Sequence, residues 1–428
     1  MTNRRITGFQ ELLTPVGRRL LEGLDAAEAD ADPLKAATRL RRDPALAGLP
    51  AETAADLVNA ALTQARLRRR AREKFGPLAD RLFFTPDGLE QATRSPVATH
   101  RARRLAERVA PDSAAPVGDL CCGIGADLIA LAGAGLAVEG VDLDPLTVAV
   151  AGANIEAAGL SALARVREGD VASTRPGDYS AVFCDPARRG RRGRIFDPRA
   201  YSPSWDTVLG LARSAPAACV KAAPGIPHEL IPDDASTEWI SVDWEVKEAA
   251  LWFGALSDES AAPGPARRAT LIRTRTGAPG PEVTTLAGRG LGAPPVSAPL
   301  RYLYEPDGAV IRSHLVAEAA DAVDGALIDP AIAYITSDSL VRTPLCRAYE
   351  VTEVMPFSLK RLRAALRERR AGRVTIKKRG SAVDVDKLRR DLRPSGPEAV
   401  VVVLTRIGDR PFCLLCDEVS AADGPSGG

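Results

Sequence analysis

The stretch Asp119-Leu120-Cys121-Cys122-Gly123-Ile124-Gly125-Ala126-Asp127 decides the fold, because it joins a short apolar segment to a helical one. Its two glycines permit a strand-to-helix turn in which the backbone comes close to a ligand. Many folds share a glycine-rich turn, so the meaning of this one depends on the segments around it.

Short apolar segments alternate with helical segments on both sides of this turn. We expect strands at 117–121, 137–141, 164–167, 180–184, 217–221, 239–246, 248–254 and 268–273. We expect helices at 126–132, 145–158 and 204–212. The alternation predicts a doubly wound, mainly parallel α/β sheet, with the last two strands forming a hairpin.

Acidic residues follow four successive strands of this predicted sheet. They are Asp119, Asp142, Asp170 and Asp185. The carboxyl ends of parallel strands meet at one edge, where doubly wound sheets bind ligands. A carboxylate after the second strand can accept two hydrogen bonds from a ribose diol. Asp144 competes with Asp142 for that role, although its place before Pro145 favours capping of the next helix.

Together these motifs resemble those of the class I methyltransferases: the D-x-x-x-G-x-G turn, the acid after the second strand, and an Asp-Pro step after the fourth. The resemblance implies a seven-stranded Rossmann-like sheet and S-adenosyl-L-methionine as the cofactor. We expect no metal, because none of the three histidines lies in an arrangement typical of a metal site. The residues expected to bind the cofactor are Asp119, Cys121, Gly123, Gly125, Asp142 and Asp170.

A dinucleotide-dependent dehydrogenase is the main alternative for the glycine turn. The turn lacks the third glycine of the dinucleotide fingerprint. Asp127, near the helix start, would also repel a pyrophosphate, whereas S-adenosylmethionine has no phosphate and is a net cation.

The segment after the fourth strand, Asp185-Pro186-Ala187-Arg188, resembles the Asn/Asp/Ser-Pro-Pro-aromatic step of N-methyltransferases, with an arginine in place of the aromatic residue. It is also similar to the Asp-Pro-Ala-Arg step of RNA 5-methyluridine methyltransferases. Those enzymes need a nucleophilic cysteine in a Ser-Cys-Asn-Pro turn after strand five, where this chain has Cys219 inside the strand. We expect the catalytic residues to be Asp185, Pro186, Arg188 and Lys221, with Lys221 contacting the substrate or pairing with Asp185.

Residues 82–93, just before the sheet, contain two phenylalanines and a Glu-Gln pair. Two readings stay open. The segment is either a flap over the cofactor or a helix packed against the edge of the sheet.

The net charge is only +2, from 57 basic and 55 acidic residues, so a signal for a polyanionic partner must be local. Six arginines follow Pro186 up to residue 199, and residues 355–393 hold 14 basic and four acidic residues. Such clusters supply phosphate contacts without sequence information. The residues expected to bind RNA are Arg189, Arg191, Arg192, Lys377, Lys378 and Arg379.

The chain is long enough for two or three domains. We expect an N-terminal helical region at 1–75, a methyltransferase domain at 76–275, a Pro/Gly-rich linker at 276–298 and a small α+β domain at 299–420. The C-terminal region resembles the THUMP-like domain that follows Asp-Pro-Ala-Arg-type methyltransferase domains in some bacterial proteins. True THUMP domains bind RNA, which supports an RNA partner by analogy alone.

Three further patterns of the sequence concern membrane spans, secretion signals and disulfide bonds. No apolar run approaches the roughly 18 residues that span a bilayer, and no signal-type segment follows the N-terminus, so we expect a cytoplasmic protein without a membrane partner. The spacing of the seven cysteines is not typical of a disulfide framework. We expect Cys413 and Cys416, which form a single C-x-x-C motif, to lie buried in a strand.

These observations favour an S-adenosylmethionine-dependent methyltransferase that modifies a base in RNA, either tRNA or rRNA. The alternatives are a methyltransferase for a small molecule and a catalytically inactive RNA-binding protein. The intact acids at four strand ends argue against loss of activity.

Overall fold

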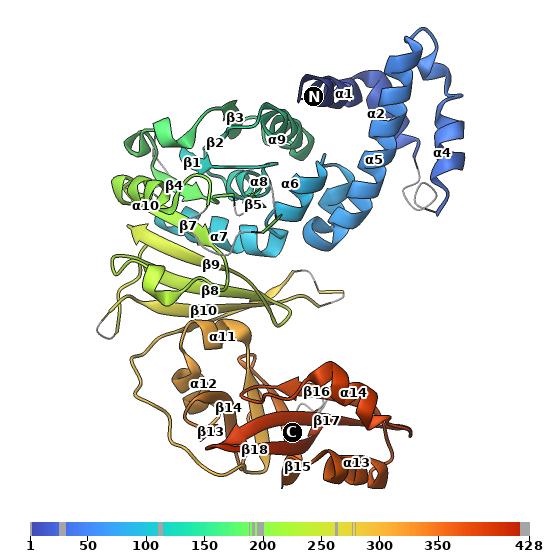
Figure 1. The fold of residues 1–428 in the computed structure, drawn as a ribbon. Helices are drawn as coiled ribbons and strands as arrows, with labels where there is room; N and C mark the ends of the chain where they lie inside the picture. The colour runs from blue at the N-terminus through green and yellow to red at the C-terminus, as the bar shows by residue number, and fades with distance from the viewer. Residues whose placement is uncertain are drawn as a thin grey trace, which may run out of the picture. The chain divides into compact units, whose positions relative to one another are not determined.

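The computed structural model describes residues 2–24, 31–109, 114–187, 189–190, 193–194, 201–261, 264–275, 277–278 and 280–419. The chain divides into two compact units (Figure 1). The first comprises Met1–Ser236 and Glu248–Asp258, and the second comprises Thr237–Lys247 and Glu259–Gly428. Among the described residues, none of the helices combines the length and apolar character needed to cross a bilayer.

The first unit contains a mainly parallel sheet whose strands follow the order β9-β7-β4-β1-β2-β3. The strands are β1 (Val117–Leu120), β2 (Val138–Asp142), β3 (Ala164–Glu168), β4 (Ala181–Cys184), β7 (Ala217–Ala222) and β9 (Glu245–Gly254). All adjacent pairs are parallel except β7 and β9. Every residue of β1, β4 and β7 is buried, as expected for strands covered on both faces.

Helices connect the parallel strands and cover the sheet. They are α8 (Ala126–Gly133), α9 (Pro145–Ala158) and α10 (Trp205–Ser214), with 3-10 turns at η3 (Val171–Ser173), η4 (Pro176–Asp178) and η6 (His228–Leu230). The chain reverses direction along the sheet between β1 and β4, and doubly wound sheets bind ligands at such a switch point. The predicted doubly wound α/β class is confirmed.

The predicted N-terminal helical region is present, and much of its apolar surface packs in a cluster shared with the methyltransferase sheet's helices. It comprises α1 (Thr2–Leu13), α2 (Pro15–Glu22), α4 (Pro33–Leu40), η1 (Pro44–Leu46) and α5 (Ala51–Phe75). The chain continues through η2 (Gly76–Asp80), α6 (Pro86–Gln91) and α7 (Ser95–Arg108). Side chains of α1, α2 and α5 share one apolar cluster with Ile124 and with Val150 of α9.

In the second unit, β10 (Arg267–Arg273) pairs in parallel with β8 (Ser236–Val242) and antiparallel with β11 (Glu282–Ala287). The predicted hairpin of β9 with β10 is therefore wrong, since β10 lies beside β8. The expected linker 276–298 contains β11, because the β-prone run Val-Thr-Thr-Leu lies between its proline and glycine residues. Within residues 76–275, where the resemblance implied a seven-stranded sheet, the described structure has the six sheet strands of the first unit and β8 and β10 of the second.

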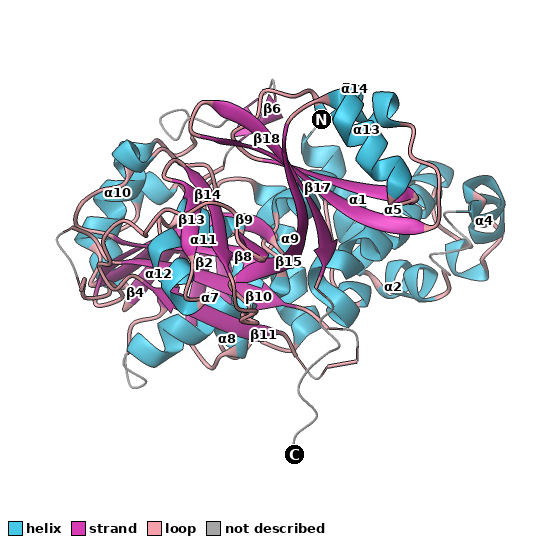
Figure 2. Cartoon of the chain, turned by 90° about the horizontal axis from the view of Figure 1, so that it is seen from below, coloured by secondary structure: helices cyan, strands magenta, loops and turns pink. Residues whose placement is uncertain are grey.

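The remainder of the second unit contains a seven-stranded sheet in the order β13-β14-β12-β15-β18-β17-β16. Figure 2 labels β13, β14, β15, β17 and β18 of this sheet. Its strands are β12 (Tyr302–Pro306), β13 (Ala326–Asp329), β14 (Ile332–Ser337), β15 (Cys346–Pro356), β16 (Ala371–Lys378), β17 (Glu398–Ile407) and β18 (Arg410–Glu418). Its helices are α11 (Gly308–Arg312), α12 (Val316–Ala322), α13 (Leu359–Glu368) and α14 (Val385–Leu392).

Cys413 and Cys416 are both fully buried in β18, as expected. Because strand side chains alternate between faces, Cys413 joins the apolar cluster under α13 and α14 while Cys416 joins the cluster on the opposite face. The two thiols therefore point away from each other.

Candidate active site

The turn after β1 has an unusual backbone. Cys121, Gly123 and Gly125 all have positive φ, at 66°, 56° and 87°. The backbone N–H groups of Cys121 and Cys122 both donate to the carbonyl oxygen of Val141, at 2.9 and 3.1 Å, which fixes the turn to the end of β2. A Cβ added to Gly123 would meet no atom within 4 Å, so the backbone lies open on that side.

The carboxylate of Asp142 holds this turn from the neighbouring strand. One oxygen accepts from the N–H of Gly123 and the other from the N–H of Asp144, both at 3.0 Å. Burial raises the pKa of Asp142 despite these hydrogen bonds. Asp144 instead caps α9 by accepting from the N–H of Thr147, as its position before a proline predicted. Asp144 therefore acts as the predicted helix cap, and the ribose contact of Asp142 stays a prediction.

Asp119 lies beneath the turn, only 1% exposed, and it does not line the cavity. Neither carboxyl oxygen has a hydrogen-bond partner among the described residues. Burial, followed by the neighbouring carboxylates of Asp127 and Asp185, raises its pKa well above the ordinary value. This surrounding favours the neutral acid until a positively charged group approaches.

Lys221 and Asp185 form an ion pair at the carboxyl ends of β7 and β4. Lys221 Nζ lies 2.6 Å from Asp185 Oδ2 and 2.8 Å from Thr93 Oγ1. The lysine side chain is 4% exposed and that of Asp185 is 23% exposed. Of the two roles expected for Lys221, the structure therefore shows the pairing with Asp185.

Behind this pair lies a fully buried charge network that the sequence did not reveal. Arg101 of α7 is 0% exposed and pairs with Asp127 at 2.9 Å and with Glu248 at 2.8 Å. Its guanidinium also lies 4.2 Å from the ring centre of Phe183. Arg101 shares a helix face with Val97, Ala98, Ala102 and Leu105, and this apolar spacing was the signal that it is buried.

Residues 82–93 are fixed over the site by buried amides. Gln64 both donates to and accepts from the backbone of Phe84, at 2.6 and 3.0 Å. The side-chain amide of Asn154 likewise accepts from the backbone N–H of Phe83 and donates to its carbonyl oxygen. It also donates to the carbonyl of Ile124, so it connects α9, this segment and the glycine turn. Both phenylalanines are buried, and Phe83 packs edge-on against Phe9 with their ring centres 5.7 Å apart.

The helix α6 that follows lies against the glycine turn. A Cβ on Gly88 would approach Ile124 Cγ2 to 2.4 Å, so only glycine allows this contact. Lys74 Nζ donates to three carbonyl oxygens at the end of α6, at 2.7 to 2.8 Å. Burial, then the charge of Lys221, lowers the pKa of Lys74 to about 8. The segment 82–93 thus contains a helix packed against the glycine turn and also lines the cavity, while its role as a flap over the cofactor stays a prediction.

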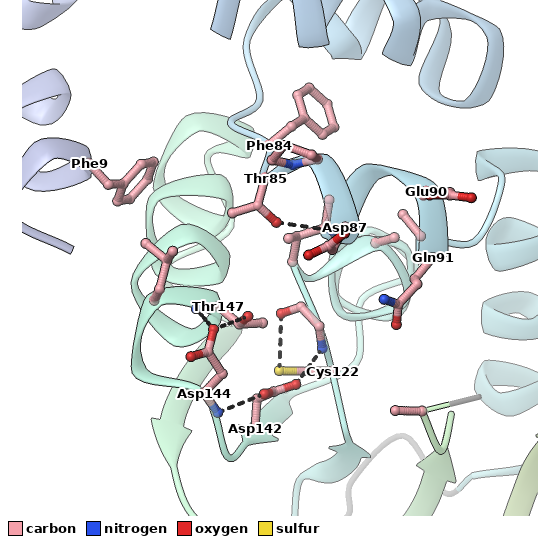
Figure 3. A pocket seen from close by; sticks show the side chains of 18 of the residues that line it. Phe9, Phe84, Thr85, Asp87, Glu90, Gln91, Cys122, Asp142, Asp144 and Thr147 are labelled. Atoms are coloured by element: carbon pink, nitrogen blue, oxygen red, sulfur yellow. Dashed lines mark hydrogen bonds between the residues drawn. The ribbon is translucent and has the colours of Figure 1, made fainter. Parts of the chain in front are cut away.

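One cavity of about 1490 Å³ lies over these residues (Figure 3). Cys121 to Ile124, Asp142, Asp144 and Thr147 line one side, and the segment from Phe84 to Thr93 lines another. Asp185, Pro186 and Ala187 also line it. In Figure 3, Asp142 and Asp144 lie below Thr85 and Asp87, across the hollow.

Several predicted site residues lie elsewhere. Asp170 is exposed, caps η3 through the N–H of Ala172, and does not line the cavity. Arg188, Arg191 and Arg192 lie outside the described residues. Arg189 begins the short strand β5 (Arg189–Gly190), which pairs with β6 (Gly193–Arg194), but its side chain is not described. Cys219 is buried and burial raises its pKa to about 12, in agreement with its expected place inside the strand.

The predicted RNA contacts in the second unit are partly engaged within it. Lys377 pairs with Glu305 at 2.9 Å, Lys378 Nζ donates to the carbonyl of Val383 at 3.1 Å, and Arg379 lies 5.3 Å from the ring centre of Tyr334. Lys378 is the exposed member of the three.

Comparison with known proteins assigns the family. The chain is 37% identical over 351 residues to an S-adenosylmethionine-dependent methyltransferase of Mycobacterium tuberculosis, found in strains CDC 1551 and H37Rv; the match covers 80% of this chain and 91% of that protein. The chain belongs to the S-adenosylmethionine-dependent methyltransferases.

The other comparisons agree with this assignment. Residues 346–418 match the THUMP domain-like family, and residues 5–71 match a domain of unknown function. A solved structure of a protein assigned as a methyltransferase from Porphyromonas gingivalis W83 has a TM-score of 0.68 at 19% identity. It covers 92% of this chain and 97% of its own, and it supports the fold.

The residues of the cavity fit the cofactor of this family. The open side of Gly123 leaves room for a ligand against the backbone, and the carboxylate of Asp142 lies beside it. Asp119 lies behind the turn without lining the cavity, so its contact with the cofactor stays a prediction.

Proposed function

We propose that this methyltransferase modifies a base in RNA, with tRNA or rRNA as the substrate class. The observation that carries the proposal is the exposed basic surface of the THUMP-like region. Exposed lysines and arginines on α13, α14 and the residues that follow each helix are Lys360, Arg361, Arg367, Arg370, Lys387, Arg389, Arg390 and Arg393.

These two helices present one basic surface because their apolar sides share a core. Leu362 and Leu366 of α13 and Leu388 and Leu392 of α14 are buried against the same sheet face. The guanidinium of Arg363 donates to the carbonyl of Asp391, which joins the helices. The charged residues therefore face solvent, where they can neutralise phosphates.

The chemistry is proposed at the Asp185-Pro186 turn. When bound, the cofactor supplies an electrophilic methyl group. One oxygen of Asp185 is held by Lys221, and the other is left to accept an N–H from the methyl acceptor and to orient it. Such alignment lowers the barrier of an in-line displacement by several kcal/mol. Arg188 is proposed to stack on the acceptor base, and Cys121, Gly123, Gly125, Asp119 and Asp142 are proposed to hold the cofactor.

The cofactor contact of Asp170 stays a prediction. In the described structure its carboxylate caps η3 and is exposed, so it would have to reach the adenine from the rim of the site. The RNA contacts of Arg189, Arg191, Arg192, Lys377, Lys378 and Arg379 are likewise part of this proposal.

The test is methyl transfer to RNA taken from cells that lack the protein. Wild-type protein with labelled S-adenosylmethionine is expected to label tRNA or rRNA at one nucleoside, identified by mass spectrometry. Asp185→Ala should bind the cofactor yet transfer no label. Label in a small-molecule extract but not in RNA would refute the RNA substrate.

A further inference from the structure

We propose that α1 and α5 form the acceptor-binding roof of the cavity, and that this roof admits an uncharged, amino-bearing nucleobase while excluding phosphate. The inference rests on the proposed function and gives a role to the N-terminal helices. The lining residues that these helices contribute include Phe9, Leu12, Asp56, Asn59, Ala60 and Thr63.

The size of the cavity is the first argument. Sites for one small ligand have volumes of about 300–1,000 Å³, so a cavity of about 1490 Å³ holds more than a cofactor. The candidate cofactor residues lie together at the glycine turn and at the end of β2. Residues of α6, α5 and α1 also line the cavity, and we place the methyl acceptor beside them, over the cofactor.

The construction of the roof is the second argument. Asp56, Asn59 and Thr63 recur at helical spacing, so α5 presents them on one face toward the cavity. Gln64, on the next position of that face, is committed to the backbone of Phe84. Phe9 of α1 also lines the cavity, and its ring is mostly buried against Phe83.

The charge of the lining is the third argument and selects the ligand. Among the described residues that line the cavity, seven are acidic and none is lysine or arginine. Lys221 pairs with Asp185 and Arg101 with Asp127, and Asp56, Asp87 and Glu90 are the acidic lining residues that α5 and α6 contribute. Carboxylates accept from exocyclic amino groups and repel phosphates, so the base enters and the RNA backbone stays outside.

The test is nucleoside binding to full-length protein saturated with S-adenosylhomocysteine, which occupies the cofactor's own adenosine site. Cytidine, uridine, adenosine and guanosine, each with its 5′-monophosphate, are titrated by ligand-observed NMR. At least one nucleoside is expected to bind, and its monophosphate to bind at least about tenfold more weakly.

Two roof variants and a matched control complete the experiment. Asn59→Ala and Thr63→Val should each weaken nucleoside binding by roughly 3–10-fold and leave S-adenosylhomocysteine affinity within about twofold. Arg66→Ala, on an exposed position of α5 that does not line the cavity, should change neither. Unchanged melting temperatures show that the variants are folded.

Three results would overturn the roof assignment: no binding of cytidine, adenosine or guanosine, equal or tighter binding of the monophosphate, or wild-type affinity in both roof variants. Failure of the RNA proposal is separate. If RNA accepts no methyl while nucleosides bind in the expected pattern, the RNA substrate is refuted and the roof assignment stands.

Discussion

Replacing Arg101 by methionine tests the buried network behind the active site. The change keeps an apolar side chain beside Phe183 but removes the cation that pairs with Asp127 and Glu248, whose side chains are 7% and 2% exposed. Breaking a buried pair by removing one partner costs about 3–5 kcal/mol, because a charge is left buried and uncompensated. Against a typical total of roughly 5–15 kcal/mol, this is a large loss of folding free energy.

The pH dependence of this loss has a defined sign. Burial works against ionisation of Asp127, but Arg101 and Lys221 hold its pKa below the ordinary value. In the wild type, Asp127 therefore adds stability above the unfolded pKa of about 3.9, and this is lost as pH falls through the folded pKa. Without Arg101, burial raises the pKa, and protonation relieves the penalty. The difference between variant and wild type should shrink from pH 8 toward pH 5.

The assay is urea unfolding at both pH values, followed by circular dichroism. Arg101→Lys should lower the free energy of unfolding by less than Arg101→Met does, because lysine keeps the positive charge. It should still lower it, because an ammonium group lacks the geometry with which the guanidinium pairs with two carboxylates. Arg103→Met, at an exposed position of the same helix, is the control and should stay within about 0.5 kcal/mol of wild type. An Arg101→Met variant within about 1 kcal/mol of wild type at pH 8 would refute the account of the network.

Three further predictions concern activity and binding. Lys221→Met leaves Asp185 without its cation. In steady-state kinetics kcat should fall at least about tenfold, while the affinity for the cofactor should stay within about threefold of wild type. An unchanged kcat would contradict the positioning role of Lys221. Gly88→Ala places a methyl group 2.4 Å from Ile124 Cγ2, so α6 must shift. Calorimetry should then show at least about tenfold weaker binding of the cofactor. Wild-type affinity would show that α6 is not fixed against the turn. Removing four exposed arginines should lower the slope of log RNA affinity against log salt concentration, measured by filter binding, by about 3. An unchanged slope would show that this surface does not contact RNA. These arginines are Arg361, Arg367, Arg389 and Arg390.

Local sequence patterns predicted the centre of the fold well. The apolar segment before Gly123, the glycine turn and the capping position of Asp144 are properties of a few adjacent residues, and the structure has each of them where expected. The pairing of Lys221 with Asp185 could be foreseen because both follow buried parallel strands that end at the same edge.

Contacts between distant segments could not be foreseen in the same way. Gln64 and Asn154 reach Phe84 and Phe83 across 20 and 71 residues, and no local pattern marks those amides as buried. Strand β10 lies beside β8 rather than β9, a choice made by packing and not by the turn between them. Asp170 follows its strand as expected, yet the 3-10 turn after β3 uses its carboxylate as a cap.

Calorimetric titration of wild type and Asp142→Asn with S-adenosylhomocysteine tests the placement of the cofactor most directly. Asparagine preserves the size of the side chain and one acceptor oxygen but removes the charge and the second acceptor for the turn and ribose. We predict saturable one-to-one binding by wild type and at least about tenfold weaker binding by the variant. Equal affinities in the two proteins would show that the cofactor binds away from the end of β2.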